Sequence, residues 1–394
     1  MKRIDVAVIG GGPSGLSAAW STARHGIDVA LFEEHEEIGK PRHCAGLVSG
    51  EGLKLIGMPC RSSFIENKIY RALVIFSDFC IELKKVGDPL YVLDRELFDK
   101  EMAERALRAG ANILLSAHVK ELKSVPEGII IKTTRGDYLC RLIIDGEGSR
   151  AYFARKMGLS GPRFKLPALQ MDLRGANVHD DEVLIIKGKE WAPDFFAWVI
   201  PLGDSEVRVG VASTMSCCSL LLGKLIKHHP IVSKLLRDCT IKRTYGGTIV
   251  VGSAERTYSD SFITVGDAAG QTKPLTGGGI VYGSLCGSIA GVVAAKVVRR
   301  EVEERVYETM WRRLLGVEES LGLLVREFTK GSIDRVVRLA SRAKLISLFE
   351  ESVHYDYHIT SILKRPALLL VSILFLTLLE PVKAFKYSVR TLFS

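Results

Sequence analysis

The chain opens with the segment Ile4-Asp5-Val6-Ala7-Val8-Ile9-Gly10-Gly11-Gly12-Pro13-Ser14-Gly15. Its first half is a short apolar run rich in β-branched residues, which is typical of a parallel strand buried on both faces. In the turn that follows, Gly10 permits a sharp bend and Gly12 leaves no side chain in the path of a pyrophosphate. Gly15 allows the next helix to pack closely on the strand, and the N-terminus of that helix favours an anion.

The sequence downstream of this turn supports the same interpretation. Small residues continue the helix, and residues 29–32 (Val-Ala-Leu-Phe) predict a second strand. Glu33 closes that strand with seventeen residues between it and Gly15, which is the distance at which an acidic residue accepts hydrogen bonds from a ribose 2′-OH. We interpret residues 4–33 as an adenine-dinucleotide site rather than as a purely structural glycine turn.

Composition restricts the class of protein. The 394 residues are 47% hydrophobic and 25% charged, as in an ordinary globular chain with ample material for a core. The net charge of +9 is spread along the chain and predicts no nucleic-acid-binding arm. It favours a surface facing anionic lipid or a phosphorylated substrate, with a merely solvated surface as the alternative. The eight cysteines are scattered, which indicates a reducing compartment, and no zinc-ligand spacing or other metal site is expected.

Further segments predict how the chain is organised. Asp94 is placed as the N-cap of a helix, residues 112–115 predict a buried strand, and residues 128–133 with 138–144 predict a hairpin. Residues 142–150 predict another buried strand that ends in a turn of glycine and acidic residues. Between residues 166 and 251, strand-like runs alternate with turns, which indicates an inserted antiparallel sheet. The predicted units are a discontinuous dinucleotide-binding domain (1–65, 90–155 and 245–300), a substrate domain (66–89 and 156–244) and a helical C-terminal region (301–394).

A second glycine-rich segment lies more than 250 residues after the first. Residues 262–270 (Phe-Ile-Thr-Val-Gly-Asp-Ala-Ala-Gly) predict a strand that delivers Gly266 and Asp267 at its C-terminal end, where open α/β sheets bind ligands. The helix that follows the turn 274–280 has an N-terminus suited to the negative charge of a reduced flavin, and Asp267 is placed for ribityl hydroxyls. Two such sites serve one cofactor if that cofactor is FAD, and an enzyme that uses NAD alone needs only the first.

The motifs together resemble a known fold and family. Four motifs resemble the FAD-binding fold of the flavin monooxygenases, of the p-hydroxybenzoate hydroxylase type. They are the glycine turn, Arg95 in Asp94-Arg95-Glu96-Leu97-Phe98-Asp99, Asp145-Gly146 and Gly266-Asp267-Ala268-Ala269. Within that fold, Pro41-Arg42-His43-Cys44-Ala45-Gly46 and Pro274-Leu275-Thr276-Gly277-Gly278-Gly279-Ile280 resemble the geranylgeranyl reductase family, especially the archaeal digeranylgeranylglycerophospholipid reductases. The resemblance covers roughly residues 1–300. It implies an α/β protein with a Rossmann-like FAD-binding domain, an inserted antiparallel-sheet substrate domain and a helical C-terminal region.

The resemblance also implies which residues contact FAD and substrate. For FAD they are Ser14, Glu33, Cys44, Ala45, Arg95, Val119, Asp267, Gly279 and Ile280, beside Gly10, Gly12 and Gly15 of the turn. The family signature Tyr-x-Trp-x-Phe-Pro, followed by Gly-x-Gly, is here Phe196-Ala197-Trp198-Val199-Ile200-Pro201 with Gly210-Val211-Ala212. Strand alternation places Phe196, Trp198 and Ile200 on one face, where they line a prenyl tunnel or form an ordinary sheet core. The departures at Phe196, Ile200 and Ala212 bear on the substrate more than on the reaction.

The function implied by the resemblance is the saturation of isolated C=C bonds in isoprenoid chains, most specifically in precursors of archaeal-type membrane lipids. Reduced FAD supplies a hydride and a proton reaches the other carbon, while the protein aligns the chain and excludes water. Cys44 is the candidate proton donor, and packing of its thiol against the isoalloxazine is the alternative. Neighbouring His43 is a candidate relay or a solvated loop residue. The electron donor, either a reduced nicotinamide or a ferredoxin-type protein, leaves no visible motif.

Residues 366–379 are the most apolar run of the chain. A membrane span needs about 20 residues, so this run predicts a buried helix or a segment that lies on a membrane surface. The basic, amphipathic tail that follows favours the membrane surface. We expect a cytoplasmic protein, with peripheral attachment to the cytoplasmic membrane as the alternative.

Two other functions fit parts of the pattern. One is an FAD-dependent aromatic hydroxylase or halogenase of the same fold, which needs a compact polar pocket. The other is a prenyl-lipid binding protein without chemistry, as Rab escort proteins and GDP-dissociation inhibitors are. Such a binding protein does not need an intact flavin-binding half, whereas both halves look intact in this sequence.

Overall fold

The computed structural model describes residues 1–84, 87–329 and 355–364. Its contacts divide the chain into two compact units. Unit 1 comprises Met1–Glu66, Tyr91–Leu166 and Gly247–Glu319, and unit 2 comprises Asn67–Leu90, Pro167–Gly246 and the chain from Ser320 onward. The segment 156–166, which the sequence assigned to the substrate domain, therefore lies in unit 1. The apolar run 366–379 lies outside the described residues.

A six-stranded sheet forms the centre of unit 1. Its order is β19 (Tyr258–Ser259), β20 (Phe262–Thr264), β13 (Leu142–Asp145), β2 (Val6–Ile9), β3 (Val29–Phe32) and β9 (Asn112–Leu114). All neighbouring strands pair in parallel except β19 with β20. Every residue of β2, β3 and β13 is buried, so the apolar runs predicted the central strands correctly. The strand β9 lies at the edge with exposed and half-buried residues, so the prediction of a buried strand at 112–115 was wrong in burial.

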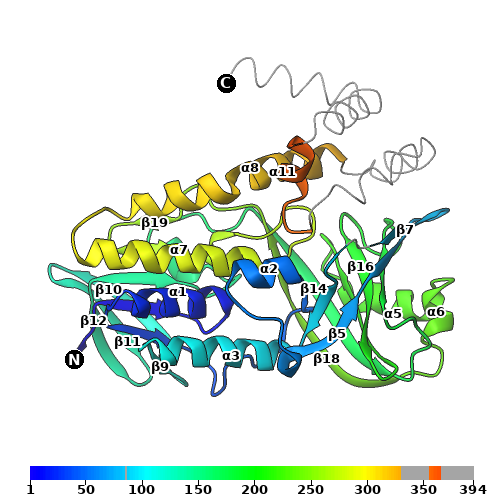
Figure 1. Ribbon diagram of the computed structural model, residues 1–394, viewed down its shortest axis with the longest axis horizontal. Coiled ribbons are helices and arrows are strands. Elements are labelled where there is room, and N and C mark those ends of the chain that lie inside the picture. Colours follow the sequence, from blue (N-terminus) through cyan, green and yellow to red (C-terminus); the bar gives the residue numbers. More distant parts are fainter. Residues whose placement is uncertain (85–86, 330–354, 365–394) are drawn as a thin grey trace, which may run out of the picture. The chain divides into compact units, whose positions relative to one another are not determined.

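Helices cover one face of this sheet (Figure 1). They include α1 (Pro13–Arg24), α3 (Arg95–Arg108) and α7 (Ile280–Val298), with α8 (Arg305–Thr329) running beside α7 and the short α2 (Gly50–Leu55) near its start. The α1 and α7 backbones approach closely: a Cβ at Gly287 would lie 2.1 Å from the carbonyl oxygen of Ser14. Within the described residues, α7 is also the one helix long and apolar enough to cross a membrane, but most of it is buried as a core helix is.

A four-stranded sheet packs against the opposite face of the parallel sheet. Its order is β1 (Lys2–Arg3), β12 (Gly136–Cys140), β11 (Gly128–Thr133) and β10 (Val119–Val125), with α4 (Tyr152–Lys156) in the same apolar cluster. The predicted hairpin arm 138–144 is divided in the structure. The chain leaves this sheet after Cys140 and enters the parallel sheet at Leu142, because the two halves of the arm pair with different partners.

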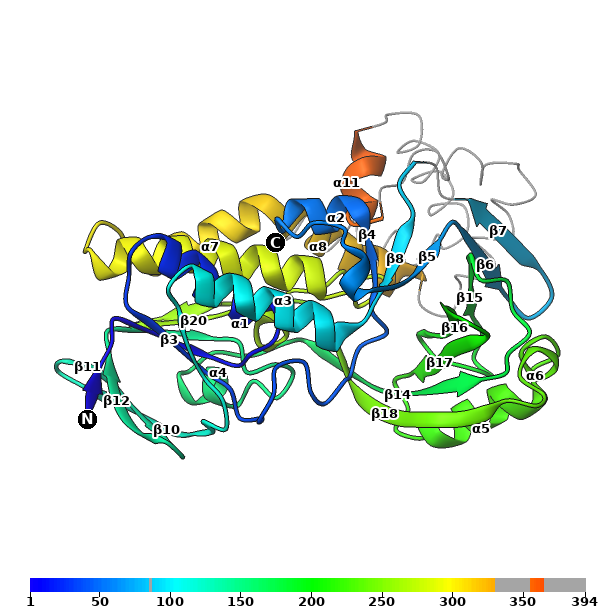
Figure 2. The same ribbon diagram turned by 60° about the horizontal axis from the view of Figure 1, so that its bottom comes forward.

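Shorter elements complete unit 1. A three-stranded sheet has the order β4 (Leu47–Ser49), β8 (Leu90–Leu93) and β5 (Ile65–Ile69), of which Leu90 and the β5 residues from Asn67 onward belong to unit 2. The 3₁₀ turns of unit 1 are η1 (Ser62–Phe64) and η2 (Gly266–Ala269). Asp94 is the N-cap of α3, as predicted, since its Oδ1 accepts hydrogen bonds from the N–H groups of Glu96 and Leu97. Figure 2 shows α3, α1 and α7 in one layer.

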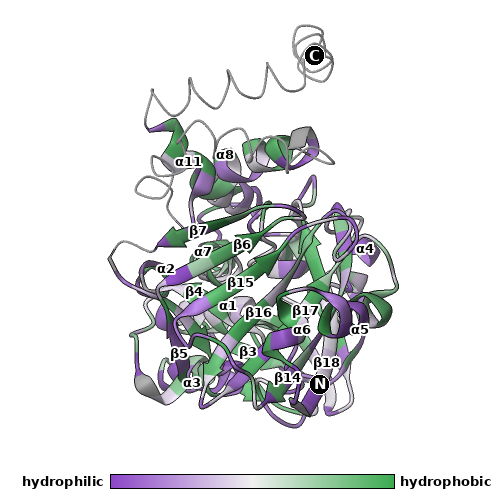
Figure 3. Ribbon diagram, turned by 90° about the vertical axis from the view of Figure 1, so that its right-hand side faces the viewer, coloured by the Kyte–Doolittle hydropathy of each residue, from purple (hydrophilic) through white to green (hydrophobic). Residues whose placement is uncertain are grey.

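Unit 2 is built on a seven-stranded sheet. Its order is β18 (Thr240–Val251), β14 (Phe164–Arg174), β17 (Glu206–Ala212), β16 (Phe196–Gly203), β15 (Glu182–Ile186), β6 (Arg71–Ile75) and β7 (Cys80–Lys84). The pairs β14–β17, β17–β16, β16–β15 and β6–β7 are antiparallel, as predicted, whereas β15 pairs with β6 in parallel. Apolar residues run along its strands (Figure 3). One face packs on α5 (Cys218–His228) and α6 (Val232–Leu235), and the described C-terminal part holds α11 (His358–Leu363).

Candidate functional site

The glycine turn of unit 1 opens toward the N-terminus of α1. Gly12 is the N-cap of this helix, no side chain caps it, and a Cβ at Gly12 would meet nothing within 4 Å. Gly10 has φ +94° and a Cβ there would lie 2.4 Å from the carbonyl oxygen of Gly146. A Cβ at Gly15 would lie 2.0 Å from the carbonyl oxygen of Gly10, so strand and helix are in direct contact. Free N–H groups and open space at Gly12 form a cradle that an anionic diphosphate fits.

Glu33 lies at the C-terminal end of β3, beside this turn. It is only 9% exposed, and its Oε2 accepts a hydrogen bond from Gly11 N–H (2.6 Å). Its Oε1 contacts His35 through the backbone N–H (2.9 Å) and the ring Nδ1 (2.6 Å). Ala117 N–H donates to the Glu33 carbonyl, which brings the segment before Val119 to the same strand end. The carboxylate is therefore fixed where a ribose would lie.

Asp267 occupies the second predicted half of the site, in the η2 turn after β20. Burial raises the pKa of its carboxyl to about 6, although the nearby Arg95 charge acts in the opposite direction. A Cβ at Gly279 would lie 3.0 Å from Asp267 Oδ1, so only a glycine fits easily at the start of α7. Gln271 fixes the turn by accepting a hydrogen bond from Gly266 N–H and donating one to the Tyr307 hydroxyl, both at 2.8 Å.

Arg95 connects Asp267 with the Cys44 loop. Its guanidinium donates two hydrogen bonds to Asp99, at 3.1 and 2.8 Å, and lies near the Cys44 thiol. Burial acts to lower the pKa of Arg95, but Asp99 and Cys44 outweigh it and raise that pKa above its ordinary value. Cys44 Sγ also accepts from Gly46 N–H (3.4 Å), and Arg42 secures the loop through Asp94 and Glu66. His43, the candidate relay, is exposed.

The N-terminus of α7 supplies the remaining polar groups. Gly279 is its N-cap, again without a side-chain cap, and Ile280 is its first residue. Among the described residues, the buried Thr276 Oγ1 has no hydrogen-bond partner. An unpartnered hydroxyl, an uncapped helix and a buried carboxylate indicate a polar ligand at this place. The two uncapped helix starts, with an acid at each, fit a dinucleotide whose halves reach both.

All twelve residues predicted to bind FAD lie in unit 1: Gly10, Gly12, Ser14, Gly15, Glu33, Cys44, Ala45, Arg95, Val119, Asp267, Gly279 and Ile280. Some of these residues are in direct contact with the other glycine-rich segment. A Cβ at Gly266 would lie 2.5 Å from Ser14 Oγ, which joins the two glycine-rich segments. Val119 is almost fully buried and belongs to the core cluster beneath the parallel sheet. Among the described residues, no group of three or more His, Cys, Asp or Glu side chains is arranged to hold a metal ion.

The predicted substrate residues lie on β16 of unit 2. Phe196, Trp198 and Ile200 share the face opposite to Ala197 and Val199, which pack in the cluster covered by α5 and α6. The rings of Phe196 and Trp198 are 6.0 Å apart at 68°. Trp198 lies across Gly210 of the paired strand, where a Cβ would come within 2.3 Å of the indole. The matching Trp and Gly of the signature are thus one packing unit.

The same face carries a buried polar cluster that the sequence analysis missed. Arg208, 1% exposed, donates to Asp172 at 2.9 and 3.2 Å, and the Tyr245 hydroxyl donates to Asp172 Oδ1 at 2.8 Å. Burial raises the pKa of the Tyr245 phenol. The sequence signal for this cluster was one charged residue at an inward position in each of two apolar strands, Asp172 in 170–173 and Arg208 in 207–212. The sequence does not show that these two strands pair with each other.

Known proteins match most of this chain. A family model described as lycopene cyclase protein matches residues 5–342. A digeranylgeranylglycerophospholipid reductase 2 from Methanopyrus kandleri is 32% identical over 300 residues, 72% of this chain and 75% of that protein. One from Methanothermobacter thermautotrophicus is 31% identical over 375 residues, 89% of this chain and 95% of that protein. The chain belongs to the geranylgeranyl reductase family. The chain also belongs to the family that the lycopene cyclase model describes.

Solved structures share the fold of this geranylgeranyl reductase family member. A geranylgeranyl bacteriochlorophyll reductase-like protein from Thermoplasma acidophilum has a TM-score of 0.81 at 24% identity, covering 92% of this chain and 96% of that one. A halogenase variant in complex with FAD has a TM-score of 0.71 at 13% identity, covering 97% of this chain and 92% of that one. The predicted flavin-binding α/β fold and the predicted FAD cofactor are confirmed. The protein is a flavin-dependent oxidoreductase of its family.

Proposed function

We propose that the protein reduces isolated C=C bonds in geranylgeranyl chains of archaeal-type membrane lipid precursors. One observation carries the proposal: reductases named for such a phospholipid match at 31–32% identity, in one case over 89% of this chain. The matching halogenase structure is only 13% identical, which supports the shared fold and no more. The isoprenoid lipid, a reduced nicotinamide or ferredoxin-type electron donor and a cytoplasmic location are all parts of this proposal.

The residues of unit 1 fit FAD, and each group of them would bind a different part of the cofactor. Glu33, fixed by Gly11 N–H, would bind the adenosine ribose, and the uncapped N-terminus of α1 would hold the diphosphate. Asp267 would accept from ribityl hydroxyls, and the N-terminus of α7 lies next to it. When bound and reduced, FAD supplies the hydride for one carbon of the double bond. The other carbon needs a proton, which the protein must deliver in a site that excludes water.

Cys44 is the proposed source of that proton. Its sulfur accepts a hydrogen bond from Gly46 N–H at 3.4 Å and lies near Arg95, which contacts Asp99 and acts on Asp267, so the thiol is placed beside the charged groups of the site. The alternative role for Cys44 is to pack against the flavin ring without transferring a proton. Cys44→Ser and Cys44→Ala distinguish these roles when turnover is measured together with the flavin content. Loss of turnover with FAD retained supports proton donation, whereas full turnover in both variants rules it out.

The lipid product tests the proposed reaction. The full-length protein, supplied with FAD and a chemical reductant, is incubated with a digeranylgeranyl glycerophospholipid, and the lipids are analysed by mass spectrometry. The proposal predicts products that gain hydrogen in pairs, one pair for each bond reduced. An unchanged lipid mass would contradict it. Oxygen consumption with a hydroxylated or halogenated aromatic product would instead support the alternative oxygen chemistry, and a colourless protein that binds the lipid without changing it would support a binding protein.

A further inference from the structure

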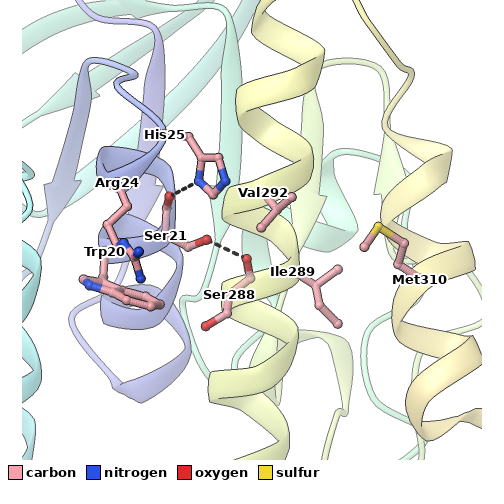
Figure 4. Close-up of a pocket in the computed structure, with 8 residues that line it drawn as sticks. All are labelled: Trp20, Ser21, Arg24, His25, Ser288, Ile289, Val292 and Met310. Atoms are coloured by element: carbon pink, nitrogen blue, oxygen red, sulfur yellow. Dashed lines mark hydrogen bonds between the residues drawn. The ribbon is translucent and has the colours of Figure 1, made fainter. Parts of the chain in front are cut away.

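A groove crosses the helical layer of unit 1 between α1, α7 and α8. It has a volume of roughly 360 Å³ and is lined by Trp20, Ser21, Arg24, His25, Ser288, Ile289, Val292 and Met310. Figure 4 shows Trp20 and Arg24 on α1 at one side, Ile289 and Val292 on α7 in the middle, and Met310 on α8 at the other side. The groove residues of α1 lie at its C-terminal end and those of α7 lie in its middle, so the groove lies apart from the candidate flavin site at the helix starts.

Apolar residues extend the groove along α8. Met310, Leu314 and Val317 are spaced as one helix face and are 41%, 47% and 53% exposed. Such side chains occur singly on most surfaces, but here they continue an apolar groove. Arg313 lies exposed on the same face. We call Met310, Leu314 and Val317 the α8 stripe.

An arginine pair borders the groove at Trp20. The guanidinium carbons of Arg24 and Arg105 lie 4.9 and 3.6 Å from the centroid of the Trp20 ring. Burial, and then the charge of Arg24, lower the pKa of Arg105, so the two cations repel each other. In the described part of the chain neither forms an ion pair with a carboxylate, and the bond that Arg105 makes is to the Ile56 carbonyl. Two repelling cations beside an apolar surface favour an anionic partner.

We propose that this face docks on an anionic lipid bilayer, with the α8 stripe and Trp20 entering the interface and the arginine pair binding lipid phosphate. A tryptophan ring with charged neighbours is typical of the boundary between water and lipid. Exposed apolar residues flanked by basic ones bind membranes through buried apolar area and electrostatic attraction together. A second copy of the chain fits less well, because a two-fold interface would bring the arginine pairs against each other. The proposal is independent of the reaction proposed above.

Vesicle sedimentation of the full-length protein tests this docking. The protein is mixed with vesicles of phosphatidylcholine alone or of phosphatidylcholine with phosphatidylglycerol. We expect binding to the anionic vesicles that weakens with salt, and an about fivefold weaker affinity for Arg24→Gln. The double variant Met310→Gln and Leu314→Gln should also bind more weakly. Matched controls are Lys123→Gln, at an exposed lysine of β10, and Leu220→Gln, at a leucine of α5 that is 74% exposed; both should bind as the unchanged protein does.

Tryptophan fluorescence gives a second measurement. Of the four tryptophans, Trp191, Trp198 and Trp311 are at most 8% exposed, so a blue shift on anionic vesicles should come from Trp20 and disappear in Trp20→Phe. Equal vesicle binding by the Arg24 and α8-stripe variants would overturn the proposal and assign the contact to another part of the chain. A dimer in solution that the α8-stripe variant dissociates would overturn it in favour of a second copy. Equal binding to neutral vesicles would also contradict it.

Discussion

Glu33 and Asp267 are the two acids of the candidate flavin site, and their surroundings differ. Glu33 is held by a backbone N–H of the glycine turn at 2.6 Å. Asp267 is buried near Arg95, and the structure gives it a raised pKa of about 6. One carboxylate is therefore already positioned by the protein, whereas the other carries a cost of burial that a bound ligand can relieve.

Replacing Glu33 tests the adenosine end of the site. Glu33→Gln keeps the shape of the side chain but removes the charge that receives the ribose hydroxyls, so FAD should bind roughly tenfold more weakly. The measurement is a titration of the FAD-free protein with FAD, followed by flavin fluorescence. Glu34→Gln is the matched control, because Glu34 is the adjacent acid and contacts His118 at the surface. Equal FAD affinities of Glu33→Gln and the control would contradict the assignment.

Asp267 gives the protein a pH-dependent stability. Its pKa of about 6 in the folded chain exceeds the roughly 3.9 of an unfolded aspartate, so the folded state holds the proton more tightly. The free energy of unfolding therefore falls as pH rises from about 4 to about 6, through this group alone. Without FAD, Asp267→Asn should exceed the unchanged protein in stability by roughly 2 to 3 kcal/mol above pH ~6, and the difference should vanish near pH ~4. Urea unfolding of both proteins across this range is the measurement, and a difference independent of pH would contradict it.

The sequence predicted these two acids because each lies at the C-terminal end of an apolar strand, Glu33 at a set distance from Gly15 and Asp267 directly after Gly266. It did not predict the partners of Cys44. Arg95 was expected to contact FAD. Its double hydrogen bond with Asp99 is an i,i+4 pair within α3, whereas its proximity to the Cys44 thiol depends on a loop and a helix that meet only in the folded chain. The Arg208–Asp172 pair was missed for the same reason, since β14 and β17 are separated by two other strands in the sequence.

At the scale of elements, the contact between α1 and α7 sets the geometry of the site. Gly287 and Gly291 of α7 face Ser14, Ala18 and Ser21 of α1, and a Cβ at Gly287 would lie 2.1 Å from backbone oxygen. Both helices begin at the candidate flavin site. Their separation therefore determines the distance between the two uncapped N-termini.

Gly287→Ala should separate the helices. The added methyl group collides with the Ser14 backbone, so we expect a loss of about 1–3 kcal/mol in stability and a weaker affinity for FAD. Thermal unfolding and FAD titration measure the two effects. Gly316→Ala in α8 is the matched control, because a Cβ there would make only an ordinary contact of 3.5 Å with Arg312. If Gly287→Ala and Gly316→Ala had the same stability and the same FAD affinity, the contact between α1 and α7 would not determine the geometry of the flavin site.

Helices and strands were predicted best where a single local sequence pattern corresponds to a single element of the structure. Strands β2 and β3 and the Asp94 cap followed from local sequence. The hairpin arm was predicted to extend to residue 144 because its apolar residues run on almost without a break, whereas the structure changes sheets at Arg141. The other prediction for this segment, a separate buried strand from residue 142, is confirmed by β13. The parallel pairing of β6 with β15 joins segments about a hundred residues apart, and no local pattern carries that information.

At the scale of the whole molecule, the two units hold different groups of the predicted functional residues. Unit 1 holds every residue predicted to bind FAD, and unit 2 holds the predicted substrate residues of β16. The flavin half is supported by geometry and by family membership. The proposed substrate is supported by the names of the related reductases and by an aromatic signature that this chain matches only in part. Within that signature, Trp198 and Gly210 pack directly against each other in the structure.

The central claim, that this protein uses FAD to reduce isolated double bonds of a geranylgeranyl lipid, is tested most directly by a single turnover without oxygen. The FAD-loaded, full-length protein is reduced, freed of excess reductant and mixed with digeranylgeranyl glycerophospholipid, while flavin absorbance and lipid mass are followed together. The account predicts that the oxidised flavin spectrum returns and that the lipid gains one pair of hydrogens for each flavin oxidised. A flavin that stays reduced until oxygen is admitted, with the lipid mass unchanged, would contradict it.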